Sequence, residues 1–253
     1  MIVFRYDKTF EGLLTALFDA YSRREFPDRL LTTDEPLPLF ADRAHTVVTD
    51  AARSARAWTG LEKKLTQPVC AMLMHVWLSE LPASDELLFR YMCKAINAPA
   101  SIATDFADPD VLAVKQIAAK VSKERERLIQ FVRFQKTACE LYFAPVSPIY
   151  NALPLAVPHF ADRFAGQQWL IYDVKRQYGY YYDMQTAIEV TLDNNEHLLG
   201  GSLDQTLMAA DETLFQSLWK DYTRSLTIRE RLNPKLQRQH MPRRFWRFLP
   251  EKN

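Results

Sequence analysis

The chain changes character in the stretch LIQFVRFQKTACELYFAP, residues 128–145. Residues 129–135 and 138–145 are apolar and aromatic runs, and the short polar break Gln135-Lys136-Thr137 separates them. Two such runs on either side of a short break are typical of an antiparallel hairpin. We therefore predict that the chain enters a sheet at Leu128.

Downstream of this stretch, the pattern predicts a helix over residues 154–164 and a second hairpin made of residues 168–174 and 179–184. The predicted order is strand, strand, helix, strand, strand. Asp193-Asn194-Asn195 is expected to be a loop. A helix is expected over residues 210–232, because Leu214, Leu218, Trp219, Tyr222 and Leu226 share one helical face.

Upstream, Ile2–Tyr6 is expected to be a strand, and Thr9 is expected to cap the helix that follows. Proline-containing residues 32–40 predict a loop. We expect Ser84 to cap a later helix. The helices predicted after the loop cover residues 42–65, 66–81 and 84–97, and a further one that begins at Asp108-Pro109 and runs into the charged segment 123–127.

These elements predict an α+β protein that is mostly helical, with a small antiparallel sheet in its second half. We expect an N-terminal strand and helical bundle in residues 1–127, and the sheet, a C-terminal helix and a basic tail in residues 128–253, packed as one unit. The mixed charges of residues 123–127 are expected to lie on a solvated helix face.

The composition excludes several classes of function. Six glycines against 14 prolines argue against phosphate-cradling glycine loops. Cys70, Cys93 and Cys139 are far apart, and the five histidines are isolated, so we predict no disulfide framework, no metal site and no cofactor. Early charge at the N-terminus and the lack of a long apolar run predict a cytoplasmic protein without a membrane partner.

Charge is unevenly distributed along the chain. Residues 220–253 carry ten basic and three acidic residues, a net charge of +7, whereas the remainder has 22 basic and 28 acidic residues, a net charge of −6. Such an asymmetry indicates a polyanion-binding end. The candidates in this tail are Arg229, Arg231, Lys235, Arg243, Arg244, Trp246 and Arg247.

The tail interleaves guanidinium groups with aromatic rings in Arg243-Arg244-Phe245-Trp246-Arg247-Phe248. Arginine binds phosphate in a bidentate manner, and rings stack on unpaired bases, so the combination suits a single-stranded or distorted nucleic acid. The alternative is that the rings dock the C-terminus onto the core while the arginines pair with acidic residues. Both arrangements are compatible if the rings face inward and the guanidinium groups outward.

A second cluster surrounds His159. His159 and Arg163 are four residues apart on the predicted helix, and Asp173 and Arg176 follow a predicted strand. Histidine, carboxylate and guanidinium together can bind phosphate or move a proton, so His159 and Asp173 are the catalytic candidates. The alternative is an Arg–Asp pair that holds the helix and the hairpin together, with His159 at the surface.

Several motifs resemble a bacterial family of unassigned domain that is labelled probable DNA metabolism protein. The resemblance is carried by Phe4-Arg5-Tyr6-Asp7 at the start and by Phe131-Val132-Arg133-Phe134, Pro158-His159-Phe160-Ala161-Asp162-Arg163-Phe164 and Trp169-Leu170-Ile171-Tyr172-Asp173 in the centre. Near the end, it is carried by Ile228-Arg229-Glu230-Arg231-Leu232-Asn233-Pro234 and Met241-Pro242-Arg243-Arg244-Phe245-Trp246.

The resemblance implies an accessory role in DNA repair or modification beside a radical SAM protein, since members are encoded next to one. Some members also carry a uracil-DNA glycosylase-like domain, which this sequence does not include. The leading hypothesis is a DNA-binding accessory protein in which Arg133, Arg163, Arg176 and the tail contact phosphates. The alternatives are a nucleotide- or base-processing enzyme that uses His159 and Asp173, and a protein-binding adaptor for the radical SAM partner.

Overall fold

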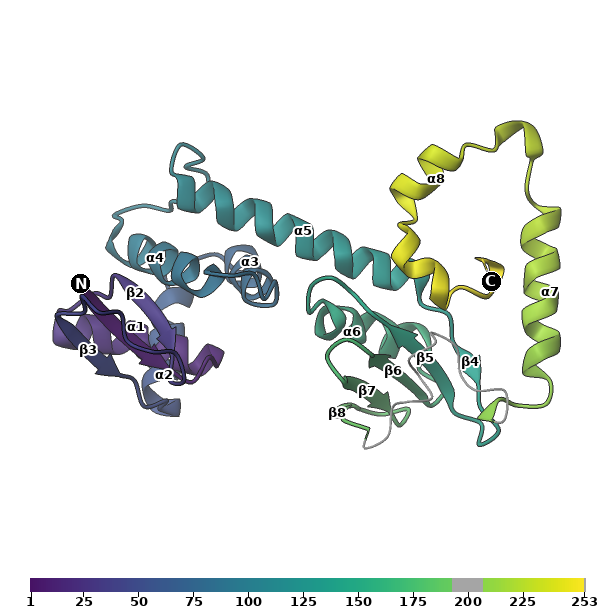
Figure 1. Ribbon diagram of the computed structural model, residues 1–253, viewed down its shortest axis with the longest axis horizontal. Helices are drawn as coiled ribbons and strands as arrows, with labels where there is room; N and C mark the ends of the chain where they lie inside the picture. Colours follow the sequence, from purple (N-terminus) through teal and green to yellow (C-terminus); the bar gives the residue numbers. More distant parts are fainter. Residues whose placement is uncertain (193–206, 253) are drawn as a thin grey trace. The chain divides into compact units, whose positions relative to one another are not determined.

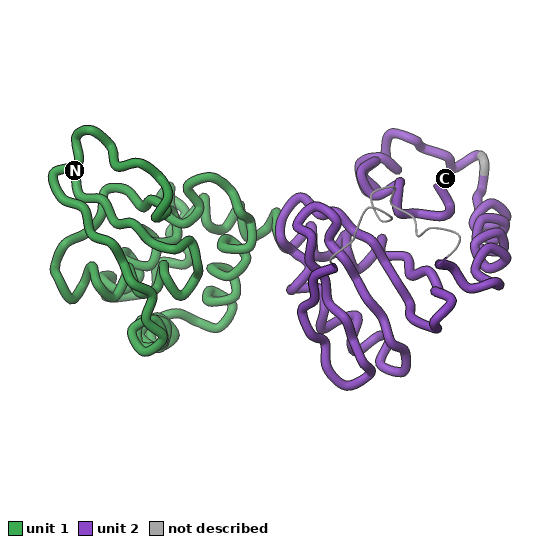
Figure 2. The backbone as a smooth tube through the Cα atoms, turned by 60° about the horizontal axis from the view of Figure 1, so that its bottom comes forward, with its two compact units in different colours: residues 1–121 green, residues 122–253 purple. Residues whose placement is uncertain are grey.

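The computed structural model of the protein describes residues 1–192 and 207–252, apart from the side chain of Arg229. The chain forms two compact units, residues 1–121 and 122–253 (Figure 2). Their boundary falls inside α5 (Pro109–Phe131), so one helix supplies residues to both units. Among the helices described, none is long and apolar enough to span a membrane.

The first unit contains a small parallel sheet. β1 (Ile2–Tyr6) lies between β2 (Arg29–Thr32) and β3 (Arg43–Thr46), and both neighbours run parallel to it (Figure 1). α1 (Phe10–Arg23) follows β1. The hydroxyl of Thr9 accepts the backbone N–H of Gly12 at 2.9 Å, which confirms the predicted cap.

Residues 43–46 form a strand where the sequence predicted the first turn of a helix. The following run, Thr46-Val47-Val48-Thr49, is β-branched throughout and favours extended backbone. The helix α2 (Ala51–Glu62) begins only after Asp50, whose carboxylate accepts the backbone N–H of Arg53 at 2.8 Å. β3 therefore pairs with one edge of β1, and the apolar pattern of the sequence did not predict this strand.

The rest of the first unit is helical, as predicted. α3 (Gln67–Trp77) begins with Pro68 in its first turn, and α4 (Ser84–Asn97) has the predicted bounds. Ser84 does not cap α4; the residue before the helix is Ala83, in a left-handed conformation and without a capping side chain. The core includes buried apolar side chains from the sheet and helices: Phe4, Leu13, Leu17, Leu73, Leu88, Tyr91 and Val114.

The second unit is built on a five-stranded sheet in the order β4-β5-β6-β7-β8. Its strands are β4 (Gln135–Lys136), β5 (Tyr142–Val146), β6 (Trp169–Asp173), β7 (Tyr178–Tyr182) and β8 (Ala187–Val190). The predicted α+β class is confirmed, and both hairpins form. The β5–β6 pair is parallel rather than antiparallel, because α6 (Leu153–Arg163) carries the chain back before β6 begins.

The stretch 128–145 enters the sheet later than predicted. α5 continues through Phe131, because the buried residues Val121, Leu128 and Phe131 remain on one helical face. Only Gln135 and Lys136 are left to form β4, and they pair with Phe143 and Tyr142. The apolar run 129–135 is therefore divided between a helix end and a very short strand.

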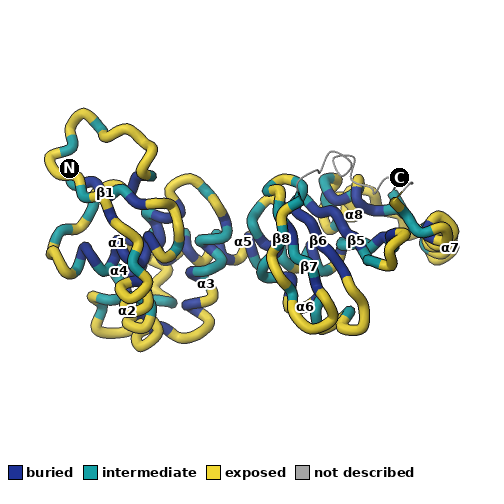
Figure 3. Tube along the Cα trace, turned by 90° about the horizontal axis from the view of Figure 1, so that it is seen from below, coloured by how far each residue is buried: buried dark blue, intermediate teal, exposed yellow. Residues whose placement is uncertain are grey.

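The C-terminal part of the second unit is a series of short helices. They are α7 (Glu212–Ser225), η3 (Arg229–Arg231), α8 (Pro234–His240), η4 (Arg243–Phe248) and η5 (Pro250–Lys252). The helix predicted over 210–232 thus ends at Ser225. Most of α7 is exposed (Figure 3), and every residue of α8 is exposed as well. The loop predicted at residues 193–195 lies outside the described residues.

Candidate nucleic-acid interface

The end of the chain docks onto the second unit through its rings. Phe245, Phe248 and Leu249 are buried, and the ring of Phe245 lies 5.2 Å from that of Phe131 at the end of α5. Part of the aromatic motif in the tail therefore serves as an apolar anchor. This matches the alternative in which rings face inward.

A buried carboxylate fastens the same segment. The Glu124 side chain is 1% exposed, and it accepts hydrogen bonds from Arg127, from Arg244 and from the backbone N–H of Ile149 at 2.9 Å. The prediction that residues 123–127 form a solvated face is thus wrong for Glu124. It lies three residues after Val121 and four before Leu128, so it shares their buried face. Arg244 has a structural partner and is not displayed.

Other cations of the tail are displayed. Arg231, Lys235 and Arg243 are exposed, as is Arg238, and none of the four forms an ion pair with a carboxylate of the described residues. Arg247 is exposed and lies over the ring of Phe248. The Arg229 side chain lies outside what the structure describes. The tail therefore separates into an anchoring part and a cationic part.

Trp246 lies between these two parts. Its indole N–H donates to the carbonyl oxygen of Met241 at 3.0 Å, and the side chains of Arg243 and Lys252 lie over its ring. The ring is half-buried. Two cations of the same segment therefore contact this ring.

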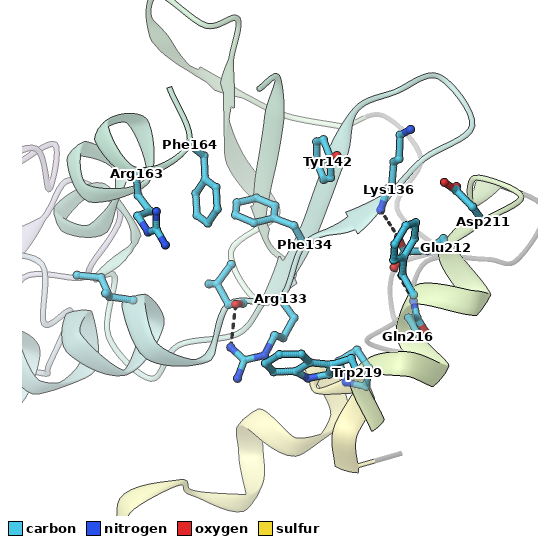
Figure 4. A pocket seen from close by; sticks show the side chains of 14 residues that line it. Arg133, Phe134, Lys136, Tyr142, Arg163, Phe164, Asp211, Glu212, Gln216 and Trp219 are labelled. Carbon is cyan, nitrogen blue, oxygen red and sulfur yellow. Dashed lines mark hydrogen bonds between the residues drawn. The ribbon is translucent and has the colours of Figure 1, made fainter. Parts of the chain in front are cut away.

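A pocket of about 840 Å³ opens between β4, the end of α6 and α7 (Figure 4). Rings contribute much of its lining. The rings are those of Phe134 just before β4, Tyr142 of β5, Phe164 just after α6, and Phe215 and Trp219 of α7. Pockets of this size hold ligands with the dimensions of a nucleotide or a drug.

Three cations and two carboxylates also line the pocket: Arg133, Lys136, Arg163, Asp211 and Glu212. Arg133 is held in place by Glu251 at 3.0 Å and by the carbonyl oxygens of Gln130 and Val132. Arg163 is exposed, lies over the ring of Phe164 and forms no ion pair with a described residue. The two arginines therefore differ, because one is a fixed part of the wall and the other is available to an anion.

The α7 wall of the pocket is fastened at both ends. Near the start of α7, the buried Glu212 accepts the backbone N–H of Lys136 at 3.0 Å and the amide of Gln216 at 2.9 Å. Further along, the Trp219 indole donates to Glu251 at 3.0 Å, the same carboxylate that holds Arg133. These side-chain hydrogen bonds keep α7, with its rings, at the pocket that Phe134 and Phe164 also line.

The residues of the predicted His159 cluster do not all interact with one another. Asp173 interacts with Arg176 and not with His159. Asp173 is fully buried, pairs with Arg176 at 2.8 Å and accepts the backbone N–H of Lys175 at 2.9 Å. Burial raises the pKa of the Asp173 carboxyl, although the bonds from Arg176 oppose that shift. Arg176 also donates to the carbonyl oxygens of Pro148 and Ile149. This pair fastens the β6–β7 turn.

His159 is exposed on α6, and its ring contacts Phe160. Among the described residues, no hydrogen bond or ion pair links His159 with Asp173. No group of His, Cys, Asp and Glu side chains in the described part of the chain is arranged to hold a metal ion.

The structure brings Arg133 and Arg163 together at the pocket although 30 residues separate them in sequence. Sequence reasoning missed the ring residues there. A local signal was present, because each of these arginines is followed directly by a phenylalanine, Phe134 and Phe164, whose rings lie 5.1 Å apart. The contributions of Phe215 and Trp219 depend on where α7 packs, so no local pattern marks them.

Comparisons with known proteins place the chain in a family. Residues 82–251 match the model of DUF4130, a domain of unknown function, and the chain belongs to that family. A solved structure of a pGpG-specific phosphodiesterase, PggH from Vibrio cholerae, is similar at 12% identity and a TM-score of 0.34, over 88% of this chain and 98% of that chain. A likeness this weak carries no argument. No curated protein matches the sequence significantly.

Proposed function

We propose that this protein binds DNA in a single-stranded or distorted form through its C-terminal segment. One observation carries the proposal: Arg231, Lys235, Arg238 and Arg243 are exposed without a carboxylate partner among the described residues, on a segment whose rings are docked. Cations without a carboxylate partner attract phosphates. Because the segment is already anchored, little conformational entropy is lost when it binds them. The family resemblance of the sequence suggests DNA as the polyanion.

The resemblance also suggests the setting of this binding, an accessory role in DNA repair or modification beside a radical SAM protein. In that role the protein holds the DNA while its partner supplies the chemistry. The absence of an ion pair or hydrogen bond between His159 and Asp173 gives no support to an enzyme that uses those two residues together.

Fluorescence anisotropy with a labelled single strand, a duplex and an RNA strand of the same sequence tests the proposal. For a single strand, each neutralised phosphate contributes about 0.7 to the slope of log affinity against log salt. The triple variant Lys235→Gln, Arg238→Gln, Arg243→Gln should lower that slope by about 2 and weaken binding at low salt. Salt-insensitive binding, or no binding to either DNA, would refute the proposal.

A matched control removes the same charge elsewhere. Arg56, Lys63 and Lys120 are exposed cations of the first unit, and their replacement by glutamine should leave the slope unchanged. If both triple variants lose affinity equally, net charge alone explains the binding and the C-terminal segment is not the interface.

A second candidate function is a protein-binding adaptor, and one observation favours it. α7 and the segment after it, up to Leu232, carry large apolar side chains that are about half exposed or more: Leu214, Phe215, Leu218, Tyr222, Leu226, Ile228 and Leu232. Exposed apolar patches of this kind often bind proteins. Copurification with the radical SAM partner in the absence of DNA, lost on Leu218→Asp with Leu226→Asp, would support it; DNA-dependent copurification would not.

A further inference from the structure

We infer that the pocket between β4, α6 and α7 receives one unstacked nucleobase of a bound DNA strand, with a phosphate of that nucleotide against Arg163. This inference rests on the proposed function, because the strand must first be held by the C-terminal segment. It adds a ligand class and a position for that ligand, which exposed cations alone do not specify.

The rings provide the surface that a base needs. Phe134 and Phe164 lie across the pocket from Trp219 of α7 (Figure 4). Phe215, also of α7, is a further ring of the lining. Phe134 is itself fixed by the buried side chains of Phe160 and Trp169. An aromatic wall attracts any base because every base has a π-face, so these rings favour stacking before they favour one sequence.

The charges give the ligand a direction. Arg133 is neutralised by Glu251, and Lys136 pairs with Glu140 at 2.8 Å, whereas Arg163 has no carboxylate partner among the described residues. A phosphate therefore gains most at Arg163, on the α6 side. The base is then directed away from Arg163, toward Trp219 and the first turns of α7.

A polar group stands where the base edge would lie. The Gln216 amide is oriented by its hydrogen bond to the buried Glu212, which leaves its carbonyl oxygen and a second N–H for other partners. A side-chain amide offers an acceptor and a donor together, the arrangement that pairs with the edge of a base. Groups for stacking, for phosphate binding and for an edge contact thus line one pocket.

Photo-crosslinking tests the inference. A single strand that carries one 5-iodo-deoxyuridine is bound to the full chain and irradiated, and the crosslinked peptide is identified by mass spectrometry. We expect crosslinks to Phe134, Phe164, Phe215 or Trp219. Crosslinks at Trp246 instead would overturn the pocket while leaving DNA binding intact.

A matched pair of variants completes the test. Phe215→Leu removes a pocket ring, 57% exposed, and Phe106→Leu removes a partly exposed ring of the first unit, 42% exposed, that is not part of the pocket lining. The first should lower crosslink yield and single-strand affinity about tenfold, and the second should change neither. Equal effects would overturn the inference. Circular dichroism melting establishes that both variants are folded.

Failure of the two proposals is distinguishable. DNA could bind with the expected salt slope without crosslinks to the pocket rings and without an effect of Phe215→Leu. That result would refute the pocket inference and leave the proposed function standing. The opposite case is a pocket that binds a ligand in a protein that does not bind DNA. It is tested by titration with a deoxynucleoside monophosphate, monitored by tryptophan fluorescence and repeated with Arg163→Gln. Arg163-dependent binding of the mononucleotide without any DNA binding would refute the proposed function and identify the pocket as a site for free nucleotides.

Discussion

The buried carboxylate of Glu124 offers the sharpest test of how the cationic segment is held. The substitution Glu124→Gln keeps the shape of the side chain and removes its charge. The glutamine carbonyl oxygen can still accept the backbone N–H of Ile149, but its NH₂ group then faces the donors of Arg127 and Arg244. Two guanidinium groups lose their shared carboxylate.

The size of the effect follows from burial. Glu124 is 1% exposed, whereas the side chains of Arg127 and Arg244 are 20% and 28% exposed, so both guanidinium groups retain some water. A hydrogen bond to a charged group contributes about 1.5–3 kcal/mol. Because part of that loss is recovered by solvation, we expect the free energy of unfolding of the second unit to fall by about 2 kcal/mol.

Urea unfolding measures this change. In a background with Trp58→Phe and Trp77→Phe, tryptophan fluorescence reports only Trp169, Trp219 and Trp246 of the second unit. With a slope of about 2 kcal/mol per molar urea, the midpoint should fall by about 1 M. Trypsin cleavage after Arg243 and Arg244 should also become faster, since the segment is held less firmly.

The control is Glu126→Gln, which removes the same charge two residues further along α5 from an exposed position. Surface substitutions of this kind change stability by less than about 0.5 kcal/mol. A loss below that value in Glu124→Gln, or equal losses in both variants, would refute the assignment of Glu124 as the anchor of the C-terminal segment.

Further predictions concern local packing and chemistry. In Gly179→Ala the new Cβ would lie 2.4 Å from the carbonyl oxygen of Ile171, so we expect a loss of about 1–3 kcal/mol in thermal unfolding, against almost none for Gly166→Ala, which meets no atom within 4 Å. Hydrogen bonding from Thr137 lowers the pKa of the exposed Cys139 thiol, whereas burial raises the pKa of Cys93 to about 11. Iodoacetamide near neutral pH should therefore modify Cys139 first, as peptide mass spectrometry would show, and equal rates at the two cysteines would contradict this. Thr137→Val should raise the midpoint of the Cys139 pH–rate profile; an unchanged midpoint would exclude the hydroxyl as the cause.

The local pattern of the sequence was sufficient for several elements. It predicted β1, the Thr9 cap, α4 with both bounds and the β6–β7 hairpin. These elements have strong short-range determinants, namely a capping side chain, a regular apolar stripe or two aromatic runs around a turn. The charge asymmetry of the tail is likewise a property of the sequence alone.

Other features depend on contacts between residues that are far apart in the sequence. Arg43–Thr46 became a strand because β1 offered it hydrogen bonds across some forty residues of chain. Glu124 can be buried because Arg244, 120 residues away in the sequence, forms an ion pair with it. In both cases the local sequence is compatible with another structure. A distant group lowers the free energy of the observed structure relative to that alternative.

The candidate site shows the same division. The sequence alone determined that the C-terminal end carries cations and rings in excess, and that Arg133 and Arg163 are each followed by a phenylalanine. Only the tertiary structure decided which rings anchor the chain and which line a pocket, because that depends on how α7 packs against the sheet. Stacking and ion pairing act over a few ångströms, so their partners are set by the fold and not by spacing along the chain.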